Sequence, residues 1–270
     1  MELTKNEFDV IRGLVRERAG IVLEEGKEYL VESRMAALLR SSSIASMAEL
    51  MTDLGKKSKQ TEELVVDALT TNETSFFRDG KPWDLLRECI LPELIERCRE
   101  RRAIKIWCAA SSSGQEPTSL ALLMRDNFPE IASWDVRILA TDISEDMLER
   151  CRSGIYSQLE VSRGLPSSML VRYFEKEGVK WKVAPAVRKL IEYRYLNLME
   201  PIPSMPAVDL VMIRNVLIYF DEETKIGILQ RIQGVLRPDG YLMLGTAETA
   251  RSAPFERVKH EKSSYYRVAA

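Results

Sequence analysis

The chain has 270 residues, of which 45% are hydrophobic and 30% charged, and its formal net charge is −2. This composition predicts a filled core and a solvated surface, and the small net charge argues against a nucleic-acid partner or attraction to anionic lipid. No apolar run approaches the roughly 18 residues that span a membrane, and the N-terminus lacks the apolar stretch of a signal peptide, so we expect a cytoplasmic protein without membrane insertion.

The N-terminal part of the chain, residues 1–72, shows helical periodicity and no strand signal. Thr4 and Glu7 have the spacing of a capping box, and apolar residues then recur at helical intervals. Gly20 separates the first helix from a second, which the serine-rich stretch Ser41–Ser46 ends. Two shorter helices are predicted at Met47–Leu54 and Thr61–Leu69. We therefore expect a small all-helical N-terminal domain.

From about residue 100 onward, short apolar runs alternate with helical patterns. The predicted strands are Ala103–Cys108, Val136–Ala140, Leu190–Leu196, Val208–Ile213 and Tyr241–Leu244. The predicted helices between them are Glu116–Asn127, Ser144–Arg152 and Glu222–Leu236. This alternation is typical of an α/β fold with a doubly wound, Rossmann-like parallel sheet, which we expect over residues 73–270. Arg237–Gly240 is predicted to form a turn before the last parallel strand, and Tyr265–Val268 an edge strand.

One segment breaks the alternation. Two short runs of alternating polarity within Tyr173–Val187 flank a turn-like sequence at Lys176–Gly178. This pattern predicts a β-hairpin inserted into the sheet domain, at about residues 172–189.

Cysteine and histidine usage limits the chemistry. The four cysteines have no CxxC spacing, and we expect each to be a small buried hydrophobic residue. The single histidine, His260, excludes a histidine-rich zinc site and argues against a Ser-His-Asp hydrolase. We therefore expect no bound metal. We also expect the chemistry to depend on carboxylates, arginine, tyrosine, hydroxyls and the backbone.

Polar residues follow four of the predicted strands, where ligands bind in open parallel sheets. Asp142 ends the second strand, about 30 residues after the loop that follows the first, and an acid there can accept hydrogen bonds from ribose hydroxyls. Its alternative role is to cap the next helix, although Ser144 is better placed to do so. Asp142 therefore predicts a nucleoside ligand.

The loop after the first strand, Ala109–Pro117, reads AASSSGQEP and lacks both the GxGxxG and the GxxxxGK[ST] pattern. Glu116 near the start of the following helix would repel a pyrophosphate but suits a cation. S-adenosylmethionine carries an ammonium, a sulfonium and a ribose without phosphate, so we expect this cofactor. Alternatively, Glu116 is only a helix N-terminal acid that the helix dipole favours.

Five motifs in order resemble those of the chemotaxis-receptor glutamate methyltransferases, the CheR-type enzymes. They are TNETSFFRD at 71–79, SSSGQEP at 111–117, ATDIS at 140–144, YLNL at 195–198 and RNVLIYF at 214–220. The resemblance covers almost the whole chain. It implies a helical substrate-recognition domain followed by an S-adenosylmethionine-dependent methyltransferase domain. It also implies methyl-ester formation on glutamates of the cytoplasmic helices of chemoreceptors, with S-adenosylhomocysteine as the product.

The resemblance also implies roles for individual residues. Glu116 is expected to face the methionyl amino group and Asp142 to hold the ribose. Tyr219 is expected to lie near the transferred methyl, and Arg78 to pair with the cofactor carboxylate. The other expected cofactor contacts are Asn72 and Thr74 in the interdomain segment, Asn197 and Leu198 beside the adenine, and Arg214 and Asn215 at the methionine end.

Two features bear on specificity. The predicted hairpin looks shorter than in family members that dock a C-terminal receptor pentapeptide, so the chain resembles the branch that needs no such tether. A substrate glutamate is already ionised at neutral pH, so no general base is required. An arginine or a tyrosine can orient it, and the predicted catalytic residues are Arg78 and Tyr219, with Tyr219 as the first candidate for this role. Tyr219 could instead be a core residue of the VLIYF run.

Three other functions stay open at this point. The chain could methylate another protein or a small molecule, or it could be a non-catalytic sensor of S-adenosylmethionine or S-adenosylhomocysteine. A dinucleotide dehydrogenase is the third, which the missing GxGxxG pattern disfavours.

Overall fold

The computed structural model describes residues 2–251, 253–261 and 263–269. These residues form two compact units. Of the described residues, the helical unit comprises those up to Thr71 with the short segments Asn197–Met199 and Tyr219–Lys225, and the sheet unit comprises the others. Within the described part of the chain, no helix is long and apolar enough to cross a membrane.

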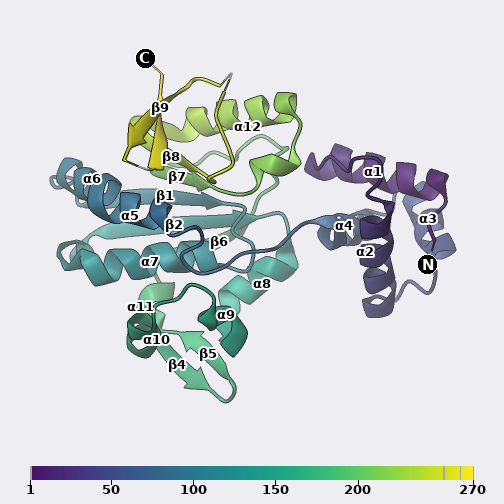
Figure 1. Ribbon diagram of the computed structural model, residues 1–270, viewed down its shortest axis with the longest axis horizontal. Helices are drawn as coiled ribbons and strands as arrows, with labels where there is room; N and C mark the ends of the chain where they lie inside the picture. The colour runs from purple at the N-terminus through teal and green to yellow at the C-terminus, as the bar shows by residue number, and fades with distance from the viewer. Residues whose placement is uncertain (1, 252, 262, 270) are drawn as a thin grey trace. The chain divides into compact units, whose positions relative to one another are not determined.

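Four helices build the helical unit around one apolar core (Figure 1). They are α1 (Lys5–Ala19), α2 (Glu28–Ser41), α3 (Met47–Gly55) and α4 (Lys59–Leu69). Thr4 and Glu7 form the predicted capping box of α1, which satisfies amide groups that the first helical turn leaves without partners. The fully buried side chains of Ile11, Val31 and Met35 lie in the core, at the helical spacing that the sequence shows.

Two segments distant in sequence belong to the helical unit through contacts with the end of α1. The amide of Val22 donates to the carbonyl of Tyr219 at 2.9 Å, and Asn197 Nδ2 donates to the carbonyl of Arg18 at 2.7 Å. Gly20 ends α1 with a φ of 71°, and a Cβ there would collide with the sulfur of Met199. A glycine is therefore required at this close approach.

The sheet unit contains a seven-stranded sheet with the order β6-β2-β1-β7-β8-β10-β9. Its parallel strands are β1 (Ala103–Ala109), β2 (Asp135–Asp142), β6 (Ile191–Tyr195), β7 (Val208–Ile213) and β8 (Leu236–Leu244). Two antiparallel strands, β10 (Ser263–Val268) and β9 (Phe255–His260), complete one edge. The parallel strands confirm the predicted α/β fold. Every residue of β7 is buried, as expected of a central strand that is covered on both faces.

Helices cover both faces of the sheet. In Figure 1, α12 (Glu222–Val235) lies on the opposite side of the sheet from α7 (Gln115–Asn127) and α8 (Glu145–Ser153). The sequence did not reveal α5 (Lys81–Leu85), the π-helical turn η1 (Leu86–Ile90), α6 (Leu91–Arg97) and the short 3₁₀ turns η2 (Pro129–Ser133) and η3 (Leu217–Tyr219). The turn predicted at Arg237–Gly240 was wrong, because these residues form a register irregularity within β8.

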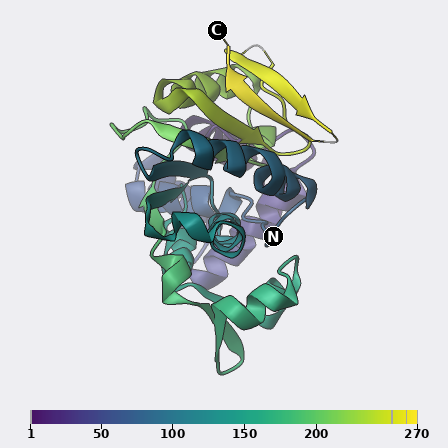
Figure 2. The same cartoon turned by 90° about the vertical axis from the view of Figure 1, so that its left-hand side faces the viewer.

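A separate three-stranded antiparallel sheet has the order β3-β5-β4. Its strands are β3 (Ile155–Ser157), β4 (Phe174–Glu177) and β5 (Lys180–Val183), and the neighbouring helices are α9 (Gln158–Ser162), α10 (Ser167–Tyr173) and α11 (Pro185–Arg188). The predicted hairpin is present, but Lys176 and Glu177 belong to β4, and the turn falls at Gly178 and Val179. In Figure 2 this small sheet lies at the end of the unit away from β9 and β10.

Candidate functional site

The loop after β1 has an unusual backbone. Ala110, Ser112 and Gly114 all have positive φ values, of 56°, 48° and 91°. Such values are uncommon for residues other than glycine and occur where surrounding contacts fix the chain. Ser112 supplies two of these contacts: its amide donates to Asp142 Oδ2 at 2.7 Å, and its hydroxyl donates to the carbonyl of Asn72 at 2.8 Å. The loop is therefore held from two sides.

Asp142 is buried at the end of β2, beside this loop. Its two carboxylate oxygens accept hydrogen bonds from the amides of Ser112 and Ser144, the latter at 3.0 Å. Ser144 is the N-cap of α8, because its side chain accepts from the amide of Met147. The helix cap is thus Ser144, as the sequence indicated, and the Asp142 carboxylate is oriented at the loop.

Arg214, which is buried, and two partly buried acidic side chains form an ionic cluster after β7. The Arg214 side chain is fully buried, and its Nη1 donates to Glu116 Oε2 at 2.7 Å. Its Nη2 donates to Asp79 Oδ2 at 2.9 Å and to the carbonyl of Arg78 at 3.1 Å. Burial raises the pKa of Glu116, and the positive charge of Arg214 acts in the opposite direction. The sequence did not reveal this pairing of Arg214 with Glu116.

The segment before α5 crosses this end of the sheet unit. The amide of Phe77 donates to Ser119 Oγ on α7 at 3.0 Å, and Arg78 Nη1 donates to the carbonyl of Glu73 at 2.8 Å. Together with the bond between Ser112 and Asn72, these contacts bring Asn72 and Arg78 to the loop, and Thr74 lies between them in the same segment.

Glu248 is a site residue that the sequence did not reveal. Its Oε2 accepts from the amides of Asn215 at 2.8 Å and Gly245 at 2.7 Å. Its Oε1 accepts from the amides of Val216 at 2.9 Å and Ile218 at 3.3 Å. One buried carboxylate thus fixes the loop that carries Asn215, which itself has a φ of 59°. No pattern in the surrounding sequence TAETA indicates this role.

The remaining predicted residues lie in the helical unit. Asn197 bridges Arg18 and Met199, because its Oδ1 also accepts from the amide of Met199 at 3.0 Å. Leu198 lies in the same segment, and Tyr219 is half-buried in the other. The structure therefore brings Asn72, Arg78, Glu116, Asp142, Arg214 and Asn215 to one end of the sheet unit, and describes Asn197, Leu198 and Tyr219 separately.

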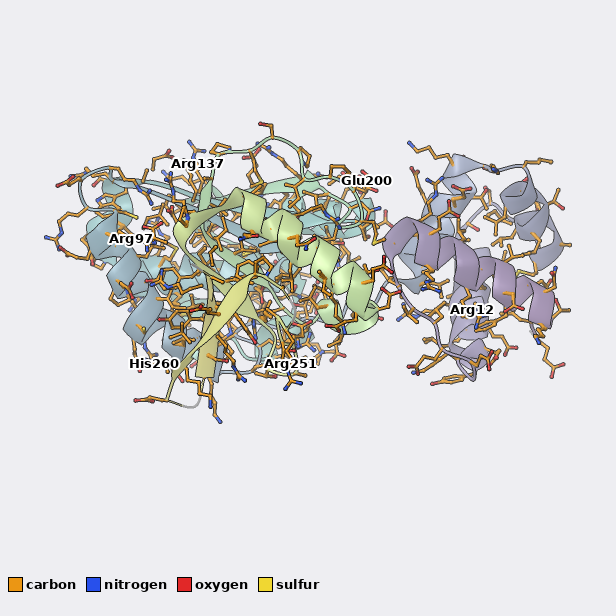
Figure 3. The ribbon with its side chains drawn as sticks, turned by 90° about the horizontal axis from the view of Figure 1, so that it is seen from above. Arg12, Arg97, Arg137, Glu200, Arg251 and His260 are labelled. Atoms are coloured by element: carbon orange, nitrogen blue, oxygen red, sulfur yellow. The ribbon has the colours of Figure 1, made fainter. Side chains whose placement is uncertain are left out.

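His260 takes no part in these contacts, whereas the Cys151 thiol donates to the carbonyl of Ser112 in the loop after β1. Cys98, Cys108 and Cys151 are buried and Cys89 is half-buried, and all four thiols are free. His260 ends β9 at the edge of the sheet, where Figure 3 labels it. Among the described residues, no group of three or more His, Cys, Asp or Glu side chains could hold a metal ion.

Comparison with known proteins decides the family. Residues 72–266 match the model described as "CheR methyltransferase, SAM binding domain", and residues 6–70 match "CheR methyltransferase, all-alpha domain". The chain belongs to the CheR methyltransferase family. It is 40% identical to Chemotaxis protein methyltransferase 1 of Pseudomonas aeruginosa, over 99% of this chain and 100% of the relative. It is 39% identical to Chemotaxis protein methyltransferase Cher2 of Pseudomonas putida, over 92% of each chain.

This CheR-family chain is an S-adenosylmethionine-dependent methyltransferase, which confirms the resemblance seen in the sequence. The chemistry of its two acids at the loop after β1 fits that cofactor. A carboxylate at Glu116 suits an ammonium group, and a carboxylate at Asp142 suits ribose hydroxyls, which are hydrogen-bond donors. The loop Ala110–Gly114 contains no lysine that could bind a phosphate. This fits S-adenosylmethionine, which has no phosphate group.

Proposed function

We propose that this enzyme converts glutamate side chains of chemoreceptor cytoplasmic domains into methyl esters. The observation that carries the proposal is the pair of oriented carboxylates at the loop after β1, the buried Asp142 and the partly buried Glu116. Membership of the CheR family and similarity to chemotaxis protein methyltransferases support the choice of a receptor substrate. The reaction would take place in the cytoplasm, where these receptor domains lie, and we expect it to need no metal.

The proposed cofactor site is made of the residues that the family resemblance implies. Asp142 would accept from the ribose hydroxyls, and Glu116 would face the amino group while Arg214 limits the cost of its burial. Arg78 would pair with the cofactor carboxylate, and Asn72, Thr74 and Asn215 would line the same end. Asn197 and Leu198 would flank the adenine. When bound, the sulfonium supplies an electrophilic methyl group.

The protein's part in the reaction is alignment rather than proton transfer. A glutamate carboxylate has a pKa of about 4.3 and is already an anionic nucleophile at neutral pH. The side chains therefore need only to orient the carboxylate in line with the methyl and sulfur and to exclude water. His260 at the edge of the sheet is consistent with this scheme, which assigns no general base.

The Tyr219→Phe substitution tests the orienting role of its hydroxyl. A hydrogen bond to a charged group contributes roughly 1.5–3 kcal/mol, so we expect turnover to fall roughly 10-fold to 100-fold with little change in cofactor affinity. Steady-state kinetics with a receptor signalling domain give both quantities. Unchanged turnover would remove the hydroxyl from the mechanism, and Tyr265→Phe, a buried tyrosine on β10, serves as the control.

Alkali treatment of the labelled product tests the reaction itself. We expect transfer of radiolabelled methyl to receptor signalling domains, and release of that label as methanol in base, because carboxyl esters hydrolyse whereas N-methyl groups do not. Base-resistant label would point to a different acceptor, and cofactor binding without transfer would point to a sensor.

The same assay addresses how receptors are recognised. The turn between β4 and β5 contains only Gly178 and Val179, which supports recognition without a C-terminal pentapeptide tether. Receptor domains with and without such a pentapeptide should then be methylated equally well. Micromolar binding of the isolated pentapeptide would contradict this part of the proposal.

A further inference from the structure

Two buried side chains hold the loop after β1 from the side of the small sheet. The thiol of Cys151, near the end of α8, donates to the carbonyl of Ser112 at 3.0 Å. The hydroxyl of Tyr156, on β3, donates to the next carbonyl, that of Ser113, at 3.1 Å. The two side chains are 1% and 2% exposed, so water cannot replace either donor.

Gly114 shows how closely these groups approach the loop. A Cβ at this position would lie 2.9 Å from Cys151 Sγ and 3.1 Å from the Tyr156 hydroxyl. The residue also has a φ of 91°, which disfavours any side chain. The single glycine of the loop is therefore required both by its backbone angle and by the two donors packed against it.

The protonation states of both donors suit this role. Burial raises the pKa of Cys151 to about 12, and it raises the pKa of Tyr156 well above its ordinary value. Both groups are consequently neutral at physiological pH and keep the proton that they donate. A thiolate or phenolate would instead repel the carbonyl oxygens.

Tyr156 also contacts the other segment of the site. Its ring packs edge-to-face on Phe76, with centroids 5.0 Å apart, and Phe76 in turn packs on Phe174 of β4 at 5.9 Å. Phe76 lies in the segment with Asn72 and Arg78, and its carbonyl approaches Gly164 so closely that a Cβ there would collide with it. The small sheet thus contacts both the loop after β1 and the segment before α5 that contains Phe76.

We propose that Cys151 and Tyr156 are positioning residues for cofactor binding: they fix the carbonyls of Ser112 and Ser113, and so hold the amide of Ser112 on Asp142. The small sheet then has a role in the cofactor site itself, as the support on which the loop after β1 is built. This inference rests on the proposed placement of the cofactor at Asp142, and it is independent of which substrate is methylated.

The test measures binding of S-adenosylhomocysteine to the full chain by isothermal titration calorimetry. Tyr156→Phe removes only the hydroxyl and leaves the Ser113 carbonyl without its donor, so we expect affinity to fall roughly five-fold to 20-fold. Cys151→Ala should weaken binding by roughly three-fold to 10-fold, while Cys151→Ser, which keeps a donor, should recover most of the loss. In kinetics, the KM for S-adenosylmethionine should rise, with kcat at saturating cofactor unchanged.

Matched substitutions elsewhere separate positioning from general stability. Tyr241→Phe alters a buried tyrosine on β8, and Cys98→Ala alters a buried thiol after α6; both should leave affinity unchanged. Folded Tyr156→Phe and Cys151→Ala variants that bind within roughly two-fold of the parent would overturn the inference. Should Tyr156→Phe fail to fold, equal binding by the two Cys151 variants would still overturn it. The deciding measurement is binding of S-adenosylhomocysteine, which needs no receptor, so failure here is distinct from failure of the glutamate methyltransferase proposal.

Discussion

Replacing Arg214 with methionine is expected to lower the free energy of unfolding of the sheet unit by roughly 3–5 kcal/mol. The guanidinium is fully buried and pairs with Glu116 and Asp79 at 2.7 and 2.9 Å. Removing it leaves Glu116, whose side chain is only 14% exposed, without its compensating charge. Burial raises the pKa of Glu116 and the positive charge of Arg214 opposes that rise, so removal of the arginine should raise the pKa further. Chemical denaturation at neutral pH measures the change.

Two further variants determine whether uncompensated charge is the cause. Adding Glu116→Gln to Arg214→Met removes the most buried carboxylate of the cluster and should recover part of the lost stability. Arg152→Met breaks an exposed ion pair with Glu145 and should cost less than about 1 kcal/mol. A loss for Arg214→Met as small as that for Arg152→Met would contradict the ionic role of the cluster.

Lowering the pH should partly rescue Arg214→Met. A buried carboxyl whose folded pKa exceeds its unfolded pKa binds more protons when folded, so its penalty is greatest at high pH and disappears below the unfolded value. The difference in the free energy of unfolding between parent and Arg214→Met should therefore narrow as the pH falls from the higher pKa of Glu116 in the variant toward the raised pKa that it has in the parent.

Hydrophobic periodicity and the order of the predicted strands were sufficient to predict the fold. They also indicated which residues lie at the carboxyl ends of the strands. The strands β1, β2 and β7 are apolar runs, and parallel strands bring their carboxyl ends to one edge of a sheet. Residues at the end of these strands or directly after it, such as Asp142 and Arg214, could therefore be expected to lie near the loop after β1. Ser144 was likewise recognisable as a helix cap from its local sequence.

The hydrogen bonds that fix the loops of the site could not be predicted from the sequence. Glu248 is 33 residues from Asn215, whose amide it binds, and Tyr156 is 43 residues from the carbonyl to which it donates. Neither residue has a local pattern that identifies its partner, because both partners are backbone groups that every residue possesses. The strand β3 is only three residues long, too short for a period to be visible.

Replacing Asp142 with asparagine is expected to weaken binding of S-adenosylhomocysteine on the order of 100-fold. The carboxylate accepts from the amides of Ser112 and Ser144 at 2.7 and 3.0 Å, so an amide group must direct its own donor at one of them. The variant would lose the charge that favours ribose hydroxyls and also disturb the loop. Asp135→Asn, at the start of the same strand and paired with Arg137 at 2.8 Å at the surface, is the matched control and should bind normally.

An analogue without ribose hydroxyls separates the two effects of Asp142→Asn. If Asp142 binds the hydroxyls, the parent should lose affinity for the 2′,3′-dideoxy form of S-adenosylhomocysteine, and the variant should lose far less, because the interaction is already absent. If Asp142 acts only through Ser112, removal of the hydroxyls should cost both proteins the same factor, and the ribose assignment would be wrong. The Ser112 amide donates its hydrogen bond to the protein side chain of Asp142 and not to the ligand. The comparison of S-adenosylhomocysteine with its dideoxy form therefore isolates the contact with the sugar.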